Sequence, residues 1–181
     1  MAADGGGWRR LARRVVHEGP YLRLVADSIE GPGGPMVYEH VQVADAVRVV
    51  AIEDDGTLLL VEDGFYLTGR RMKHLPGGGV EPGEDPRAAA ARELEEETGR
   101  RASRWRRLGV VHPLPASTAA ATHLYLATGL GPGRIDRDAE EEFLTVHRTT
   151  LAGAAALVLD GEITEAGSVA AILRAARDLP G

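Results

Sequence analysis

The stretch EDPRAAAARELEEETG, Glu84 to Gly99, carries the strongest structural signal of the chain. Asp85 can cap a helix, and Pro86 suits the first helical position because its missing N–H needs no partner there. The four alanines that follow favour helix, and Gly99 is a natural C-terminal stop. The pattern therefore predicts a helix that begins after Asp85 and ends before Gly99.

Glutamates crowd the end of this helix and fill four of the five positions 93–97. At about 100° per residue, Glu93, Glu96 and Glu97 share one edge, while Glu95 points to the far side, where we expect it to be solvated. An apolar strip that can pack on a sheet lies beside them and consists of Ala90, Ala91 and Leu94. A solvated acidic helix end explains the run poorly, because like charges three and four residues apart destabilise a helix. A hard divalent cation such as Mg²⁺, which takes oxygen ligands, resolves the repulsion.

A glycine-rich loop, LPGGGVEPGE, precedes the helix. Its triple glycine permits positive φ and a close approach to a ligand, although taken alone it also fits a plain flexible turn. Loop and helix together fit the pattern G-x5-E-x7-R-E-U-x-E-E-x-G, in which U is a bulky aliphatic residue. The eight fixed positions are Gly78, Glu84, Arg92, Glu93, Leu94, Glu96, Glu97 and Gly99.

This pattern is the Nudix box, and the sequence resembles Nudix hydrolases, which cleave nucleoside diphosphates linked to another moiety. The resemblance implies a Mg²⁺ site, in which Mn²⁺ can substitute, with the ligands Glu93, Glu96, Glu97, Glu142 and the backbone carbonyl of Gly77. The implied catalytic residues are Arg92, Glu93, Glu97, Glu140 and Glu142. Arg92 would hold the glutamates in position by charge-assisted hydrogen bonds, and Glu84 would be structural rather than a direct ligand. Arg100 departs from the family, which usually has an aliphatic residue directly after the last glycine.

A second acidic cluster, Glu140 to Glu142, stands before an apparent strand that starts at Phe143. From the residues alone it is an ordinary acidic loop. The sequence also resembles ADP-ribose-type Nudix enzymes, which have a catalytic glutamate loop before the last strand. By position, Glu142 would complete the metal site and Glu140 could be the base that activates water, but either could serve, and the choice stays open.

The resemblance to that subfamily extends over nearly the whole chain from about Tyr21, with two departures. Asp63-Gly64-Phe65 stands where the subfamily commonly has Gln-Tyr-Arg, and Thr118-Ala119-Ala120 replaces an acidic Ser-Asp-Glu stretch. Without that arginine, we expect ADP-ribose to be accepted but not to be the best substrate. An equally open alternative is that Phe65 covers an apolar edge while a neighbouring arginine supplies the charge. The implied substrate-binding residues are Phe65, Arg70, Arg71, Pro115 and Thr118.

Apolar runs separated by turn signals continue along the rest of the chain. The predicted strands are 21–30, 36–43, the two arms of a hairpin within 46–63, 70–76, 105–113 and 122–130, and the further helices are 151–161 and 166–177. This alternation predicts an α/β fold with a mixed sheet, which the resemblance makes a Nudix-type α/β/α sandwich with a small N-terminal β appendage. We expect residues 1–43 to form a disordered tail and a dimerising appendage, and residues 44–181 to form the hydrolase domain.

Composition excludes several other functions. The formal net charge of −6 has the wrong sign for a general nucleic-acid binder, and the basic stretch RRLARR, residues 9–14, is predicted to be solvated. Cysteine is absent, which excludes disulfides and thiolate metal sites and fits a reducing compartment. The six histidines form no His-x-x-x-His pair, so a zinc site lacks its usual ligands. No apolar run is long enough for a signal peptide or a membrane span.

These observations predict a cytoplasmic homodimer that acts on a small-molecule nucleotide and binds neither nucleic acid nor membrane. One alternative comes from another functional class: a Nudix-fold nucleotide-binding or sensor module that keeps the fold without turnover. The intact set of Arg92, Glu93, Glu96 and Glu97 favours the enzyme, because a degenerate sensor would be free to lose these residues.

Overall fold

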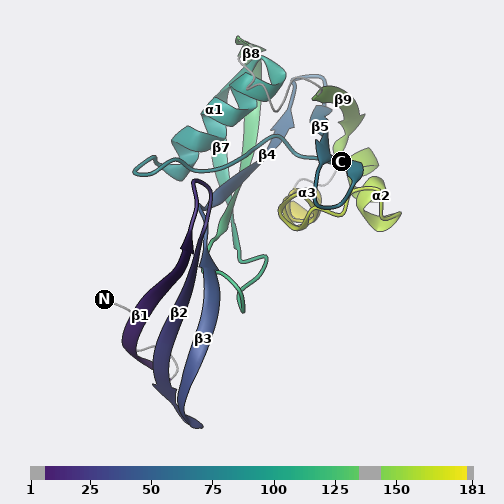
Figure 1. Ribbon diagram of the computed structural model, residues 1–181. Coiled ribbons are helices and arrows are strands. Elements are labelled where there is room, and N and C mark those ends of the chain that lie inside the picture. The colour runs from purple at the N-terminus through teal and green to yellow at the C-terminus, as the bar shows by residue number, and fades with distance from the viewer. Residues whose placement is uncertain (1–6, 135–143, 179–181) are drawn as a thin grey trace. The chain divides into compact units, whose positions relative to one another are not determined.

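The computed structural model describes residues 7–134 and 144–178 (Figure 1). In chain order the elements are β1 Arg9–Glu18, β2 Arg23–Gly31, β3 Gly34–Gln42, β4 Ala46–Ile52, β5 Thr57–Phe65, β6 Arg70–His74, α1 Pro86–Thr98, β7 Arg100–Val111, β8 Thr122–Pro132, β9 Thr145–Thr150, α2 Leu151–Leu159 and α3 Ala166–Asp178. They form two compact units: unit 1 runs to Ala44 and includes Leu114–Ala120, and unit 2 comprises Asp45–Pro113 and the chain from Ala121 onward. No helix within the described ranges is long and apolar enough to cross a membrane.

Unit 2 is built on a six-stranded sheet in the order β6-β5-β4-β8-β7, with β9 paired to β5 beside this path. Strands β4 and β8 run parallel, whereas β4–β5, β5–β6, β5–β9 and β7–β8 are antiparallel pairs. The predicted hairpin within 46–63 and the mixed sheet are therefore confirmed. Strand β7 begins earlier than predicted, directly after the C-terminal cap of α1.

Helices cover both faces of this sheet, because its central strands bury alternate residues on opposite sides. The face that packs against α1 contains the buried residues Val47, Val49, Ala51, Leu59, Tyr125 and Ala127. The face that packs against α2 and α3 contains Val50, Leu58, Leu60, Leu124 and Leu126. Within unit 2 the layers are thus α1, the sheet, and α2 with α3, which is the predicted α/β/α sandwich (Figure 1). The buried apolar residues of α1 are Ala89, Ala90 and Leu94, so Ala89 belongs to the apolar strip for which the sequence predicts Ala91.

Helix α1 begins and ends where its sequence signals predict. The Asp85 side chain accepts hydrogen bonds from two N–H groups of the first turn at 2.9 and 3.2 Å. Gly99 ends the helix with φ 67°, a left-handed conformation that glycine adopts without strain. Leu94 is fully buried, which contributes about 1.5–3 kcal/mol to stability. The same helical phase places Glu93 and Glu97 on the buried side of the helix. Their carboxylates therefore need hydrogen-bond or charged partners at this helix end.

Unit 1 contains a three-stranded antiparallel sheet in the order β1-β2-β3, which is the predicted extra N-terminal sheet. The sequence predicts no strand before residue 21, so β1 is an addition. All ten residues of β1 are exposed, and a strand without alternating burial gives no periodic signal. Arg13 fastens it by donating from Nε and Nη2 to the two carboxylate oxygens of Asp27, each at 2.7 Å. These hydrogen bonds outweigh burial and lower the pKa of Asp27 to about 2, so at least Arg13 of the basic stretch is not merely solvated.

A loop distant in sequence completes unit 1. The Tyr38 hydroxyl donates to the backbone carbonyl of Ala116 at 2.6 Å, and the N–H of Val41 donates to the carbonyl of Ser117 at 2.8 Å. Leu114–Ala120 therefore clusters with the N-terminal strands and not with the two strands that it connects. The division into an appendage of residues 1–43 and a hydrolase domain of residues 44–181 stays a prediction.

Candidate active site

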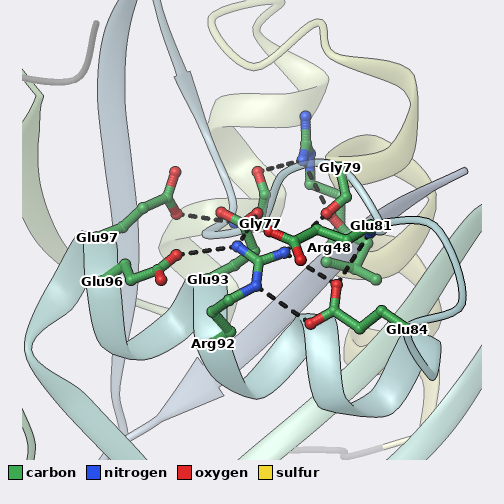
Figure 2. Close-up of polar contacts among 10 residues, drawn as sticks. Arg48, Gly77, Gly79, Glu81, Glu84, Arg92, Glu93, Glu96 and Glu97 are labelled. Atoms are coloured by element: carbon green, nitrogen blue, oxygen red, sulfur yellow. Dashed lines mark hydrogen bonds and ion pairs between the residues drawn. The ribbon is translucent and has the colours of Figure 1, made fainter. Parts of the chain in front are cut away.

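The guanidinium of Arg92 lies between the glycine loop and the glutamates at the end of α1 (Figure 2). Its Nε and Nη2 donate to the two carboxylate oxygens of Glu84, both at 3.1 Å, and Nη2 also donates to the backbone carbonyl of Gly79 at 3.0 Å. Its Nη1 donates to Glu93 at 2.9 Å and to Glu96 at 3.0 Å. The planar guanidinium thus joins the loop to the helix and orients two of the predicted metal ligands.

The charges at this site do not cancel. Hydrogen bonds from Arg92 and from the N–H of Glu81 lower the pKa of Glu84, and the bonds to Glu84 raise the pKa of Arg92, so both stay ionised. One guanidinium faces the carboxylates of Glu84, Glu93 and Glu96, and Glu97 adds a fourth on the same helix end. Four negative charges against one positive charge leave an excess that favours a cation.

Two buried carboxylates, those of Glu93 and Glu97, lie directly against the triple glycine. Glu97, with 3% of its surface exposed, accepts a hydrogen bond through Oε2 from the N–H of Gly77 at 2.8 Å. A Cβ atom on Gly78 would stand 2.6 Å from Oε1 of Glu93, so a side chain there would displace this carboxylate. Gly77 has φ +140°, and a Cβ there would lie 2.2 Å from the carbonyl oxygen of Val47. Close approach therefore favours glycine at Gly77 and Gly78, which decides against a plain flexible turn.

A hard divalent cation fits this donor set. The loop and α1 offer carboxylate oxygens on Glu93, Glu96 and Glu97 and a backbone carbonyl on Gly77, which are the oxygen ligands that Mg²⁺ prefers. Within residues 7–134 and 144–178, no group of three or more acidic or histidine side chains already has the geometry to hold a metal ion. Glu140 and Glu142, the other predicted members of the site, lie outside the described residues.

Sequence reasoning missed a charged pair behind the loop. The carbonyl of Gly77 accepts a hydrogen bond from Nη1 of Arg48 on β4, and Nε of Arg48 donates to Glu165 at 3.0 Å. Burial alone would raise the pKa of Glu165, but Arg48 and hydrogen bonds from the residues that begin α3 bring it to about 2. One signal could have pointed to Arg48, though not to its partner: Arg48 interrupts the otherwise apolar strand AVRVVAI, residues 46–52.

Two residues at the end of α1 differ from their predicted environment. Glu95 is not simply solvated, because its carboxylate pairs with Nε of Arg101 at 2.7 Å and accepts from the N–H of Arg134 at 3.0 Å. Strand β7 follows the helix without a linker and brings Arg101 back to it. Arg100, at the position where the family has an aliphatic residue, donates to Glu53 at 3.0 Å and so replaces packing by an ion pair.

The predicted substrate-binding residues belong to two different units of the chain. Phe65, Arg70 and Arg71 meet where β5 pairs with β6, and Phe65 lies edge-on to the ring of His74 at 5.4 Å. Phe65 therefore packs on a side chain of β6. Pro115 and Thr118 instead line a cavity of about 480 Å³ within unit 1. The other side chains around that cavity include Trp8, Asp27, Ile29, Tyr38 and His40.

His74 predicts an acid-sensitive step in stability. The ring is 4% exposed, Nδ1 bonds the carbonyl of Leu75 at 2.9 Å, and Nε2 has no hydrogen-bond partner among the described residues. Burial, helped by the charge of Arg48, lowers its pKa from 6.5 to about 4. Below pH 6.5 the His74 ring is therefore protonated in the unfolded chain but stays neutral in the folded protein. About 3 kcal/mol of folding stability is lost as the pH falls from 6.5 towards 4.

Urea denaturation between pH 7.5 and 4 measures this loss. His74→Asn, which keeps a donor near Nδ1, is expected to flatten the dependence of unfolding free energy on pH. An unaltered slope in His74→Asn would contradict the assignment of a neutral buried ring.

Known proteins resemble this chain over most of its length. A family model described as NUDIX domain matches residues 43–176. An ADP-ribose pyrophosphatase of Mycobacterium tuberculosis is 36% identical over 166 residues, covering 90% of this chain and 80% of that protein. An ADP-ribose pyrophosphatase of Bacillus subtilis is 31% identical over 166 residues, covering 91% and 90%. A crystal structure described as ADP compounds hydrolase matches with a TM-score of 0.85 at 27% identity, covering 96% of this chain and 94% of that one.

Proposed function

The chain belongs to the Nudix family, and on that premise we propose that it hydrolyses a nucleoside diphosphate linked to another moiety in a Mg²⁺-dependent reaction. It is a Nudix pyrophosphohydrolase of the ADP-ribose pyrophosphatase type. The observation that carries the proposal is the network in which Arg92 joins three carboxylates while a fourth, Glu97, bonds the N–H of Gly77. Water attacks one phosphorus atom of the diphosphate, and the P–O bond to the bridging oxygen breaks. The products are a nucleoside monophosphate and a phosphorylated second product.

Each residue of the network has a proposed role in this reaction. Glu93, Glu96, Glu97 and the carbonyl of Gly77 would hold the cation, which when bound lowers the pKa of water and offsets charge on phosphate oxygens. Arg92 keeps the carboxylates oriented, as its hydrogen bonds to Glu93 and Glu96 support. Glu140 or Glu142 would take the proton of the attacking water, and Glu142 would also complete the metal site.

The sensor alternative makes a different prediction from the enzyme. A binding module would retain nucleotide and cation without releasing products, whereas the enzyme turns over. Incubation of the purified protein with ADP-ribose and Mg²⁺, followed by chromatography, is expected to give AMP and ribose 5-phosphate. Binding of ADP-ribose without these products would favour the sensor.

The substrate preference is a prediction of its own. We expect ADP-ribose to be accepted but not to lead a panel of sugar nucleotides and dinucleotides, because Phe65 replaces a charged phosphate contact. The cavity beside Pro115 and Thr118 supports a proposal that these residues contact the substrate. Measured values of kcat/KM decide the matter: a lead of tenfold or more for ADP-ribose, about 1.4 kcal/mol of transition-state preference, would contradict the expectation.

We also propose that unit 1 forms the contact of a homodimer. Strand β1 lies at the edge of its sheet and exposes the apolar side chains of Leu11, Val15 and Val16 by 51%, 48% and 41%. An exposed apolar edge strand favours association. Light scattering at micromolar concentration is expected to give a dimer, and Leu11→Glu is expected to lower the dimer fraction.

A matched substitution controls for the added charge. Leu159, at the end of α2 in unit 2, is 79% exposed, so Leu159→Glu makes the same chemical change away from the proposed contact and is expected to leave the dimer intact. A full-length chain that is monomeric at micromolar concentration would refute the dimer proposal.

A further inference from the structure

Helix α3 begins on a carboxylate that also binds the sheet. Glu165, the residue before α3, accepts through Oε1 from the N–H of Gly167 at 3.0 Å and through Oε2 from the N–H of Ser168 at 2.7 Å. The same Oε2 accepts from the Ser168 hydroxyl at 2.7 Å and from Nε of Arg48 at 3.0 Å. One side chain thus caps a helix and holds an arginine of the central strand β4.

Arg48 also contacts the glycine loop (Figure 2). Its side chain is only 12% exposed, and Nη1 donates to the backbone carbonyl of Val47 at 2.9 Å and to that of Gly77. The carbonyl of Gly77 is the oxygen that the proposed function assigns to the cation. Arg48 is therefore one hydrogen bond away from a proposed metal ligand without being a ligand itself.

The start of α3 reaches the same loop by a second route. The Ser168 hydroxyl, which donates to Glu165, accepts a hydrogen bond from the N–H of Leu75 at 2.9 Å. The three-residue segment Leu75–Gly77 is thus held at its first N–H by Ser168 and at its last carbonyl by Arg48. Both Ser168 and Arg48 bond Glu165, so a single partly buried carboxylate connects the two ends of the segment.

From these contacts we propose that Glu165 and Arg48 are positioning residues for the divalent cation. Arg48 fixes the direction of the Gly77 carbonyl, which has two lone pairs and can accept from Arg48 while it faces a cation. Glu165 orients Arg48 and neutralises its charge, because an uncompensated guanidinium beside a cation site would repel the cation. The inference rests on the proposed function, since it takes the carbonyl of Gly77 as a ligand.

Binding of Mn²⁺ to the nucleotide-free protein, followed by electron paramagnetic resonance, tests the proposal. Glu165→Gln keeps one of the two acceptor oxygens at the start of α3 and removes the charge that compensates Arg48. We expect its Kd for Mn²⁺ to rise at least tenfold, measured at a temperature where circular dichroism shows the variant to be folded, because loss of the charge also lowers the metal-free melting temperature. In activity assays the Mg²⁺ concentration for half-maximal rate should rise, while kcat at saturating Mg²⁺ should change little.

The neighbouring Glu162 provides a matched control. Its carboxylate lies in the same connection between α2 and α3 and pairs with Nζ of Lys73 at 3.1 Å. Glu162→Gln therefore makes the same change in charge without touching Arg48, and its Kd for Mn²⁺ should stay within twofold of the wild type. A second variant, Arg48→Lys, keeps the positive charge but cannot bond Glu165 and both carbonyls at once, so it should also weaken Mn²⁺ binding tenfold.

Each outcome decides something. If Glu165→Gln folds and binds Mn²⁺ within twofold of the wild type, the positioning role is refuted; if it does not fold, the same result with Arg48→Lys refutes it. Wild-type Mn²⁺ binding that is lost in Glu97→Gln but kept in Glu165→Gln overturns this inference alone. A wild-type protein that binds no Mn²⁺, or a Glu97→Gln variant that binds it normally, overturns the proposed metal site and the inference with it.

Discussion

Replacing Glu97 by Gln is expected to lower kcat by about 10²- to 10⁴-fold at saturating Mg²⁺ and substrate. The carboxylate is 3% exposed and stands against the loop that offers the Gly77 carbonyl, so its charge is a central part of the attraction for a cation. Gln can still accept the hydrogen bond from the N–H of Gly77. The metal-free melting temperature, measured by differential scanning fluorimetry, should therefore stay near the wild-type value.

Glu95 offers the control for this experiment on the same turn of α1. Its carboxylate pairs with Arg101 on the other side of the helix, so Glu95→Gln removes an equal charge away from the proposed site and should keep the rate within about twofold. If Glu97→Gln retains most of the Mg²⁺-dependent activity, the assigned metal site is wrong.

The second large effect is expected at Gly77. An added Cβ would lie 2.2 Å from the carbonyl oxygen of Val47, a backbone atom of a central strand, and φ +140° is strained for any other residue. Backbone strain and overpacking together cost about 2–6 kcal/mol. Because a domain is stable by only about 5–15 kcal/mol, Gly77→Ala should lower the urea midpoint strongly or prevent folding.

Substitutions at the next two glycines, Gly78 and Gly79, are expected to separate an effect on activity from an effect on stability. A Cβ on Gly78 would meet the carboxylate of Glu93 at 2.6 Å, which is the movable end of a side chain, so Gly78→Ala should fold but lose activity. Gly79 has open space around it, and Gly79→Ala should resemble the wild type in both respects. If Gly79→Ala were as unstable as Gly77→Ala, the close approach seen in the structure could not be the reason for the triple glycine.

Local signals made the site helix and the sheet predictable. The cap at Asp85, the stop at Gly99 and the alternating apolar runs all act within a few residues. The helix ends appear where they were predicted, and the predicted strands of unit 2 are present, although β7 begins earlier. The role of Arg92 was expected from family resemblance alone. The structure adds its geometry, a fork that contacts Glu84, Glu93 and Glu96 simultaneously.

Contacts between distant segments were not predictable in the same way. Arg48 and Glu165 are separated by 117 positions, and no local pattern pairs a strand arginine with the residue before a helix. Strand β1 gave no signal because its residues are exposed on both faces. Glu95 was assigned to solvent by helical phase, which describes one helix and takes no account of the arginine that β7 brings beside it.

The loop Leu114–Ala120 has a consequence for how this protein could be recombined with its relatives. Its carbonyls at Ala116 and Ser117 accept hydrogen bonds from Tyr38 and Val41, although more than 70 positions lie between the partners. A chimaera that exchanges only the first 44 residues would import a sheet and leave its native loop behind. The foreign strands would then pack against a loop whose residues do not match them. To exchange unit 1 as a whole, a chimaera must therefore replace two separate segments of the sequence, Met1–Ala44 and Leu114–Ala120.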